Sequence, residues 1–136
     1  MDLKKTYGTT DVDLEKNGVE VDLGDGAFVT VRRSNNKKFA DALTKMRKPH
    51  ERRIQRGNNT AEFREMLDDL TRKAVAKHVV IGWRGIEVDG KAVKYSPEAA
   101  EKLMKEFEDF QEDVLTAANS RETFRKEVIE ENEKNL

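Results

Sequence analysis

The sequence contains no cysteine and no long apolar run. The absence of cysteine excludes disulfides, thiol nucleophiles and cysteine-ligated zinc, and it fits a reducing cytoplasm. No window approaches the roughly 18 apolar residues of a membrane-spanning helix, and the first residues lack the apolar segment of a signal peptide. We therefore expect a soluble cytoplasmic protein that does not interact with a membrane.

Sequence motifs for catalysis, nucleotide binding and metal binding are also missing. Neither GxGxxG nor GxxxxGK[ST] occurs, and the carboxylates Asp22 and Asp25 lack the spacing of a calcium loop. His78 shares metal-ligand spacing with no second histidine or carboxylate, so we interpret it as a structural residue. Three serines precede predicted helices and are explained as caps: Ser34, Ser96 and Ser120. We predict that the protein is not an enzyme and needs neither cofactor nor metal.

Charged residues make up 39% of the chain, yet the net charge is only -1 because the two signs are separated. Residues 32–56 contain ten Lys or Arg and two Asp or Glu, a local balance of +8. Residues 98–136 contain six basic and twelve acidic residues, a balance of -6. This separation can steer a partner to one end of the molecule or allow copies of the chain to associate basic end to acidic end.

The pattern predicts a single α+β domain, predominantly α-helical, over residues 17–136, after an irregular polar arm at residues 1–16. Residues 18–33 alternate with period two and form a predicted β-hairpin. A three-residue loop, Gly24-Asp25-Gly26, places its apolar residues on one face, with Val19 opposite Val31 and Val21 opposite Val29. Two strands alone are marginally stable, so this N-terminal hairpin must pack on the three to four predicted helices.

Helical spacing dominates residues 35–83, the predicted helical body. A first helix begins at Ser34, and it either ends near Arg47 or kinks at Pro49 and continues through Ile54 to Gly57. A second helix begins at Asn59 and extends through Ile81 to Trp83, where its widening apolar face is expected to lie deepest. Trp83 is accordingly predicted to anchor the core.

A second, short hairpin is predicted at residues 86–94 around the Asp89-Gly90 turn, followed by helices at residues 97–134. The short hairpin pairs Val88 with Lys91 and Ile86 with Val93. The helical pattern shows a break between Glu106 and Asp109, and a last helix is expected to start at Asn119 or Ser120.

Two narrow apolar stripes are candidates for contact with a partner helix. One lies on the helix before Pro49 and the other on the last helix, among glutamates, where it is too narrow to form a firm core. The candidate partner-binding residues are Phe39, Leu43 and Met46 on the first stripe, and Phe124, Val128 and Ile129 on the second.

The basic segment 47–56, RKPHERRIQR, is a candidate for electrostatic docking. Clustered Arg and Lys can bind phosphates, but the segment has no aromatic residue for base stacking, so nucleic acid is the less favoured partner. A nucleic-acid-binding adaptor is retained as the alternative function. The docking candidates are Arg47, Lys48, Arg52, Arg53 and Arg56.

Three segments carry a resemblance to a known family: NGVEVDLGDGAFVTVRR, AKHVVIGWRGIEVDGKAVKYSPEAAEKLM and FRKEVIEENEKN. In their order and spacing, from about Asn17 to Asn135, they resemble the tail assembly chaperones of long-tailed (siphovirus-type) bacteriophages. The resemblance implies a non-enzymatic protein that binds the helical, aggregation-prone tape measure protein while tail tube protein polymerises around it. It further implies a location in the host cell cytoplasm and absence from the mature virion. A minor structural component of the tail is the other alternative.

Overall fold

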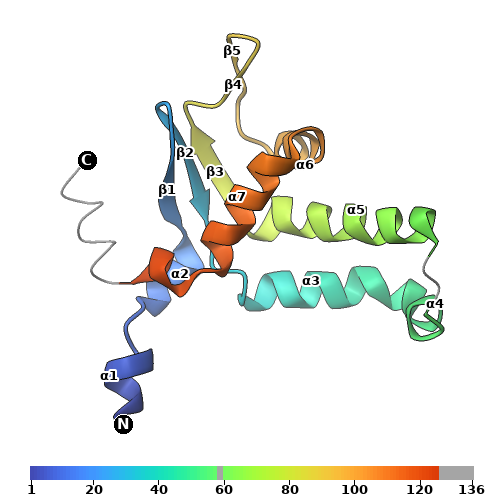
Figure 1. Cartoon of the computed structure of the whole chain (residues 1–136), viewed down its shortest axis with the longest axis horizontal. Helices are drawn as coiled ribbons and strands as arrows, with labels where there is room; N and C mark the ends of the chain where they lie inside the picture. The colour runs from blue at the N-terminus through green and yellow to red at the C-terminus, as the bar shows by residue number, and fades with distance from the viewer. Residues whose placement is uncertain (58–59, 126–136) are drawn as a thin grey trace.

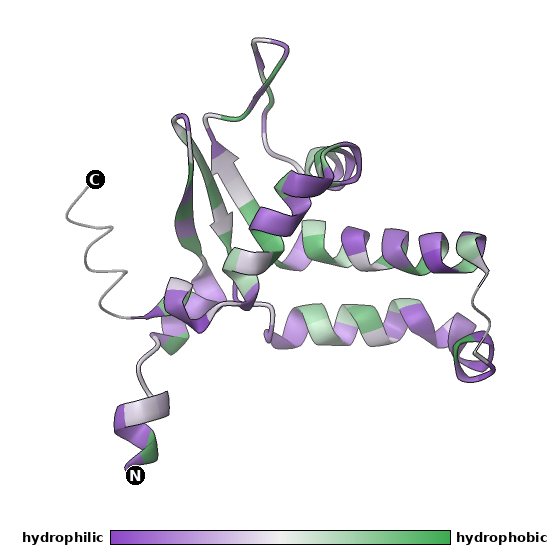
Figure 2. Cartoon of the chain, viewed as in Figure 1, coloured by the Kyte–Doolittle hydropathy of each residue, from purple (hydrophilic) through white to green (hydrophobic). Residues whose placement is uncertain are grey.

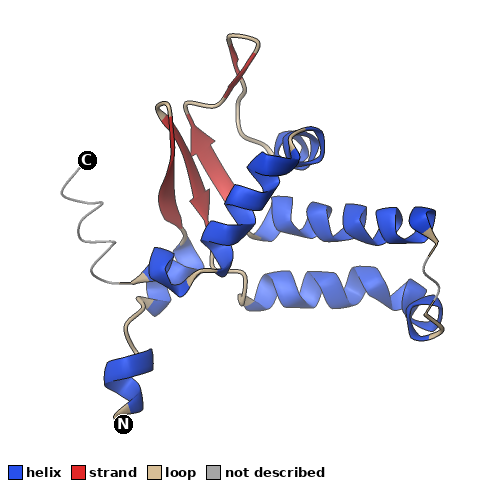
Figure 3. Ribbon diagram, in the orientation of Figure 1, coloured by secondary structure: helices blue, strands red, loops and turns tan. Residues whose placement is uncertain are grey.

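The computed structural model describes residues 1–57 and 60–125 of the chain. A three-stranded antiparallel sheet of order β1-β2-β3 and a separate two-stranded hairpin combine with helices, which confirms the α+β, mainly helical class (Figures 1 and 3). The elements in chain order are α1 (Leu3–Tyr7), α2 (Val12–Asn17), β1 (Val19–Gly24), β2 (Ala27–Val31), α3 (Lys37–Arg47), η1 (Lys48–His50), α4 (Glu51–Gln55), α5 (Ala61–His78), β3 (Val80–Arg84), β4 (Glu87–Val88), β5 (Lys91–Ala92), α6 (Pro97–Glu106), α7 (Glu108–Asn119) and η2 (Arg121–Phe124).

The first hairpin has the two valine pairs that were predicted, but its turn is different. Gly24 pairs with Ala27, so only Asp25 and Gly26 form the loop, both with positive φ. Leu23 is the extra residue of a β-bulge between the two registers. The bulge allows a tight turn and an apolar face in the same hairpin, a combination that the prediction of a three-residue loop did not consider.

The prediction of a helix that extends to Trp83 is wrong, because residues 80–84 form a third strand. The helix α5 ends at His78, and β3 pairs antiparallel with β2, with Val29 opposite Trp83 and Val31 opposite Val80. Successive β-branched residues from Val79 onward favour a strand. A short apolar run of this kind fits a buried strand or a buried helix end equally well, which explains the error.

The helices α3 and α5 run side by side away from the sheet, with α4 at their far end (Figure 1). Helix α3 ends at Arg47. Pro49 lies in the following 3-10 turn, so α3 does not continue through the proline. The caps differ from the prediction: Asn36 caps α3 in place of Ser34, and Thr60 caps α5. Asn59, the predicted cap, lies outside the described residues.

The second hairpin and the helices α6 and α7 agree with the prediction. Val88 pairs with Lys91, and the backbone N–H of Val93 donates to the carbonyl of Ile86 at 2.9 Å. The hydroxyl oxygen of Ser96 accepts a hydrogen bond from the N–H of Ala99 at 3.0 Å and caps α6. The predicted break between Glu106 and Asp109 occurs at Phe107, which separates α6 from α7.

The N-terminal segment is helical, not irregular. The side chains of Asp2 and Asp11 accept hydrogen bonds from backbone N–H groups at the starts of α1 and α2, which stabilises these short helices. The helix α2 is joined to the segment that follows β2, because Arg33 forms a 3.0 Å ion pair with Glu15. Residues 1–16 are therefore in part attached to the rest of the protein.

The core lies between one face of the sheet, the C-terminal half of α5, and helices α6 and α7. Figure 2 shows hydrophilic residues over much of each long helix and hydrophobic residues where the strands meet the end of α5. The large side chains that are fully buried in the core are Phe124, Met104, Val29, Val31, Val79, Val80 and Val114.

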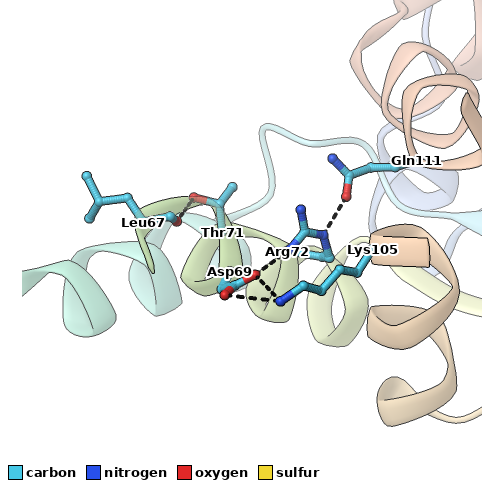
Figure 4. A network of polar contacts seen from close by, with 6 residues as sticks. All are labelled: Leu67, Asp69, Thr71, Arg72, Lys105 and Gln111. Carbon is cyan, nitrogen blue, oxygen red and sulfur yellow. Dashed lines mark hydrogen bonds and ion pairs between the residues drawn. The ribbon is translucent and has the colours of Figure 1, made fainter. Parts of the chain in front are cut away.

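A polar cluster joins α5 to α6 and α7 on the outside of this core (Figure 4). The guanidinium of Arg72 donates to Gln111 at 2.8 Å and pairs with Asp69 at 2.7 Å. Lys105 pairs with the same carboxylate at 3.1 Å. The hydrogen bond and charge of Lys105, followed by those of Arg72, outweigh desolvation and lower the pKa of Asp69. We interpret this cluster as a structural clamp, because its charges are paired within the chain.

Candidate partner-binding surfaces

A groove of about 540 Å³ lies between α3 and α4. Residues spaced three and four apart line one face of α3, and the 3-10 turn at Pro49 directs α4 across them. Leu43 and Ile54 supply its largest apolar side chains, and both are half-buried. The side chains that line this α3–α4 groove include Ala40, Leu43, Arg47, Glu51, Ile54 and Gln55.

The predicted apolar stripe on α3 divides between the core and this groove. Phe39 packs against the buried core, so it is less available to a partner than expected. Leu43 lines the α3–α4 groove. Met46 is half-buried and is not one of the groove's lining residues. Of the three candidates, Leu43 is the one that the structure places at an open surface.

Arg47 is the docking candidate that lines the groove. Lys48, Arg52 and Arg56 are exposed, and within residues 1–57 and 60–125 none of them forms an ion pair. Arg53 differs, because its guanidinium lies 4.1 Å from the ring centroid of Phe63 at the start of α5. Arg53 therefore holds α4 to α5 by a cation–π contact and is less free to bind a partner.

Trp83 packs against the core from β3 and contacts aromatic residues on both sides. Its ring meets Tyr95 edge-on at 5.2 Å and Phe110 at 6.4 Å between centroids. Its indole N–H donates to the carbonyl of Val93 at 2.7 Å. This position agrees with a structural role for Trp83, although its strand was predicted as a helix.

The stripe predicted on the last helix is only partly described. Phe124 is 0% exposed and belongs to the core, so the interpretation of Phe124 as a surface contact is wrong. It lies in a 3-10 turn after Ser120, where the predicted helix was expected to begin. Val128 and Ile129, the other two candidates, lie outside the described residues.

A second groove, of about 430 Å³, was missed by sequence reasoning. It lies between the first hairpin turn, the second hairpin and the junction of α6 with α7, and we call it the hairpin groove. Phe107 is 43% exposed there, a large value for an aromatic side chain at a helix junction. The break predicted between Glu106 and Asp109 was the available signal for an exposed residue at this position. The apolar lining includes Ile86, Val88, Leu103, Phe107 and Phe110.

The carboxylates of the two grooves do not form a metal site in the described part of the chain. Among the residues that the structure describes, no group of three or more His, Cys, Asp and Glu is arranged to hold a metal ion. None of the described helices combines the length and apolar character that a membrane crossing requires.

The family model of the YdaY prophage protein matches residues 34–135, well over half of the chain. The chain belongs to the YdaY prophage protein family. The YdaY match includes the whole α3–α4 groove and most of the hairpin groove, whereas Asp25 and Ala27 at the first turn precede it. No curated protein and no solved structure matches the chain. Membership of the YdaY family identifies the protein as phage-derived.

Proposed function

We propose that this phage-derived protein is a tail assembly chaperone that binds the tape measure protein and keeps it soluble during assembly of the tail tube. Membership of the YdaY prophage family supports a role in a phage. The three segments that resemble tail assembly chaperones support the particular role. The observation that carries the proposal is the α3–α4 groove, because it is an open surface with an apolar floor on a highly charged protein.

Such a groove suits an amphipathic helix whose apolar residues recur at helical spacing. Leu43 and Ile54 would be covered by the bound helix, and a fully buried aliphatic side chain contributes about 1.5–3 kcal/mol. Arg47 and the exposed basic residues beside it would attract a helix with acidic flanks and raise the rate of encounter. The charged residues elsewhere on the protein would keep the complex in solution.

The proposed action is binding without catalysis. The protein would shield apolar helix faces of the tape measure protein stoichiometrically. A groove with so few apolar side chains gives modest affinity, because association must also offset the lost freedom of both partners. Modest affinity allows the chaperone to leave as tail tube subunits replace it, which agrees with its expected absence from the virion. The tail tube protein and a second copy of this chain are further proposed contacts.

Co-purification tests this function. The tape measure protein encoded with this chain is co-expressed with it in tagged form, and the complex is isolated by affinity and size exclusion. We expect Leu43→Ser to reduce the recovered partner about tenfold. Leu3→Ser is the matched control, since Leu3 is 66% exposed on α1 and lines neither groove. Equal recovery with both variants would contradict the role of the α3–α4 groove.

The same preparation separates the alternatives. A nucleic-acid-binding adaptor would retain DNA in place of the tape measure protein, and the binding would weaken steeply as salt is raised. A minor structural component would be found by mass spectrometry in purified phage particles. We expect neither result.

A further inference from the structure

Unlike the α3–α4 groove, which is lined by one basic and one acidic residue, the hairpin groove is lined by charges of one sign. The two charged side chains that line it are Asp25 and Glu87, and both are acidic. Glu106 and Glu108, which flank Phe107 in the chain, are also exposed. An apolar floor with carboxylates at its rim favours a partner whose apolar residues are flanked by Lys or Arg.

The nearest arginine along the chain does not cancel this charge. Arg84 directly precedes the groove residue Gly85, but its guanidinium pairs with Glu20 at 2.6 Å and lies 3.8 Å from the ring centroid of Phe28. The charge of Arg84 is therefore balanced by Glu20 on β1. The carboxylates of the groove remain available, since neither Asp25 nor Glu87 forms an ion pair within the described part of the chain.

The walls of the groove are held in place by short contacts. Gly85, with φ of +72°, approaches the first hairpin so closely that a Cβ on it would lie 2.1 Å from the carbonyl oxygen of Gly26. Phe110 on the opposite wall contacts the ring of Trp83. Both walls are therefore attached to the sheet, and a surface that is already ordered loses little conformational entropy when it binds.

We propose that the hairpin groove binds an amphipathic helical segment in which basic residues flank the apolar ones. The proposal rests on the proposed function and adds to it the charge of the partner's segment. The α3–α4 groove lies in the segment with a balance of +8, while the hairpin groove has an acidic rim. A groove within a basic segment and a groove with an acidic rim would together set the direction in which a long helical partner lies across the protein.

Two synthetic peptides test this assignment. Each is an amphipathic helix of about 18 residues, long enough for five turns, with the same leucine spacing. One has Lys and the other Glu at the flanking positions, and neither contains tryptophan. Since Trp83 is the only tryptophan of the chain and contacts Phe110, its fluorescence reports on occupancy of the groove.

We expect the lysine peptide to bind at least tenfold more tightly than the glutamate peptide at low salt. Phe107→Ser should weaken binding of the lysine peptide about tenfold, and Glu87→Lys should largely remove the preference for the lysine peptide, because Asp25 is then opposed by a positive charge. Leu43→Ser in the other groove is the matched control and should leave the Trp83 fluorescence titration with the lysine peptide unchanged. Circular dichroism establishes that the variants fold, and Glu87→Lys alters only an exposed strand position.

Equal affinity for the two peptides, or binding that Glu87→Lys leaves unchanged, would overturn the assignment. Such a failure is distinct from failure of the chaperone function. If Leu43→Ser still reduces recovery of the tape measure protein, the function stands and only the hairpin groove is wrong. If the tape measure protein is not recovered with the wild-type chain at all, the proposed function itself fails.

Discussion

The indole N–H of Trp83 donates a hydrogen bond to the backbone carbonyl of Val93 at a distance of 2.7 Å. This bond joins β3 to the end of the second hairpin. Two residues later, the hydroxyl of Tyr95 donates to the carbonyl of Val80 at 2.7 Å. The second hairpin is therefore attached to the sheet at its base, although it is only a turn with two short strands. This attachment positions one wall of the hairpin groove.

Gly85 is predicted to be essential for the close approach of the two hairpins. Gly85→Ala combines a side chain at φ +72° with a Cβ position 2.1 Å from the carbonyl oxygen of Gly26. The left-handed conformation alone costs about 1–2 kcal/mol for a residue with a Cβ. The contact with backbone atoms adds to this, so we expect a loss of about 3 kcal/mol or more in the free energy of unfolding, measured by urea denaturation.

Gly90→Ala is the matched control for this substitution. Gly90 has φ of +76°, but an added Cβ would meet no atom within 4 Å. We expect a loss of only about 1 kcal/mol, due to the backbone conformation alone. Equal losses for the two variants would show that the two hairpins do not approach each other as described.

Asn36 is predicted to stabilise the protein by more than an ordinary helix cap. Its side-chain oxygen accepts from the N–H of Phe39 at 2.8 Å, and its amide donates to the carbonyls of Arg33 at 2.8 Å and His78 at 3.3 Å. Loss of a cap costs about 1 kcal/mol, and each further hydrogen bond contributes about 0.5–1.5 kcal/mol. We expect Asn36→Ala to lower the free energy of unfolding by about 2 kcal/mol.

Ser34→Ala provides the comparison, because Ser34 was the cap predicted from the sequence. Its backbone N–H donates to the carbonyl of Ala118, and a methyl group in place of the hydroxyl leaves that bond intact. We expect a change within about 0.5 kcal/mol. A larger effect for Ser34→Ala than for Asn36→Ala in thermal or urea unfolding would contradict the observed cap.

His78 makes stability depend on pH in a defined window. Burial, followed by the charges of Lys77, Arg32 and Lys38, lowers the pKa of His78 below its ordinary value of 6.5. The unfolded chain therefore binds a proton at this position before the folded chain does. Stability should be unaffected by His78 above about pH 6.5 and should decline as the pH falls below that value toward the folded pKa.

Urea unfolding at about pH 7.5 and pH 5.5 checks this expectation, with His78→Gln as the variant that cannot titrate. We expect the wild-type protein to lose more stability than the variant between the two pH values, and proton NMR to give a pKa below 6.5 for His78. Equal losses in the two proteins would contradict the lowered pKa.

Local patterns predicted the parts of the fold that depend on neighbouring residues. Period-two alternation gave the two valine pairs of the first hairpin, and the Asp89-Gly90 turn gave the register of the second. The serine, proline and glutamate at residues 96–98 located the start of α6. For the second hairpin and α6, the turn or cap chemistry and the apolar pattern favoured the same structure.

The remaining parts depend on tertiary contacts that one sequence does not contain. The apolar run around Val80 became a strand because β2 offered an edge for it to pair with. Asn36 became the cap because it also reaches the carbonyl of His78. Phe124 entered the core, where it is fully buried, although the surrounding glutamates indicated a surface helix.

The two candidate grooves also differ in whether local patterns or tertiary contacts determine them. Leu43 and Arg47 were predicted from helical spacing and charge, and both line the α3–α4 groove. The hairpin groove was missed because its walls come from three separate parts of the chain, around Asp25, Glu87 and Phe107. No local pattern joins segments so far apart.

The proposed function requires this protein to prevent aggregation of the tape measure protein. The most direct measurement is light scattering after denatured tape measure protein is diluted into buffer, with or without a stoichiometric amount of this chain. We predict that the wild-type chain suppresses the scattering, that Leu3→Ser does so equally, and that Leu43→Ser does so much less. Scattering that is the same with and without the wild-type chain would contradict the proposed function.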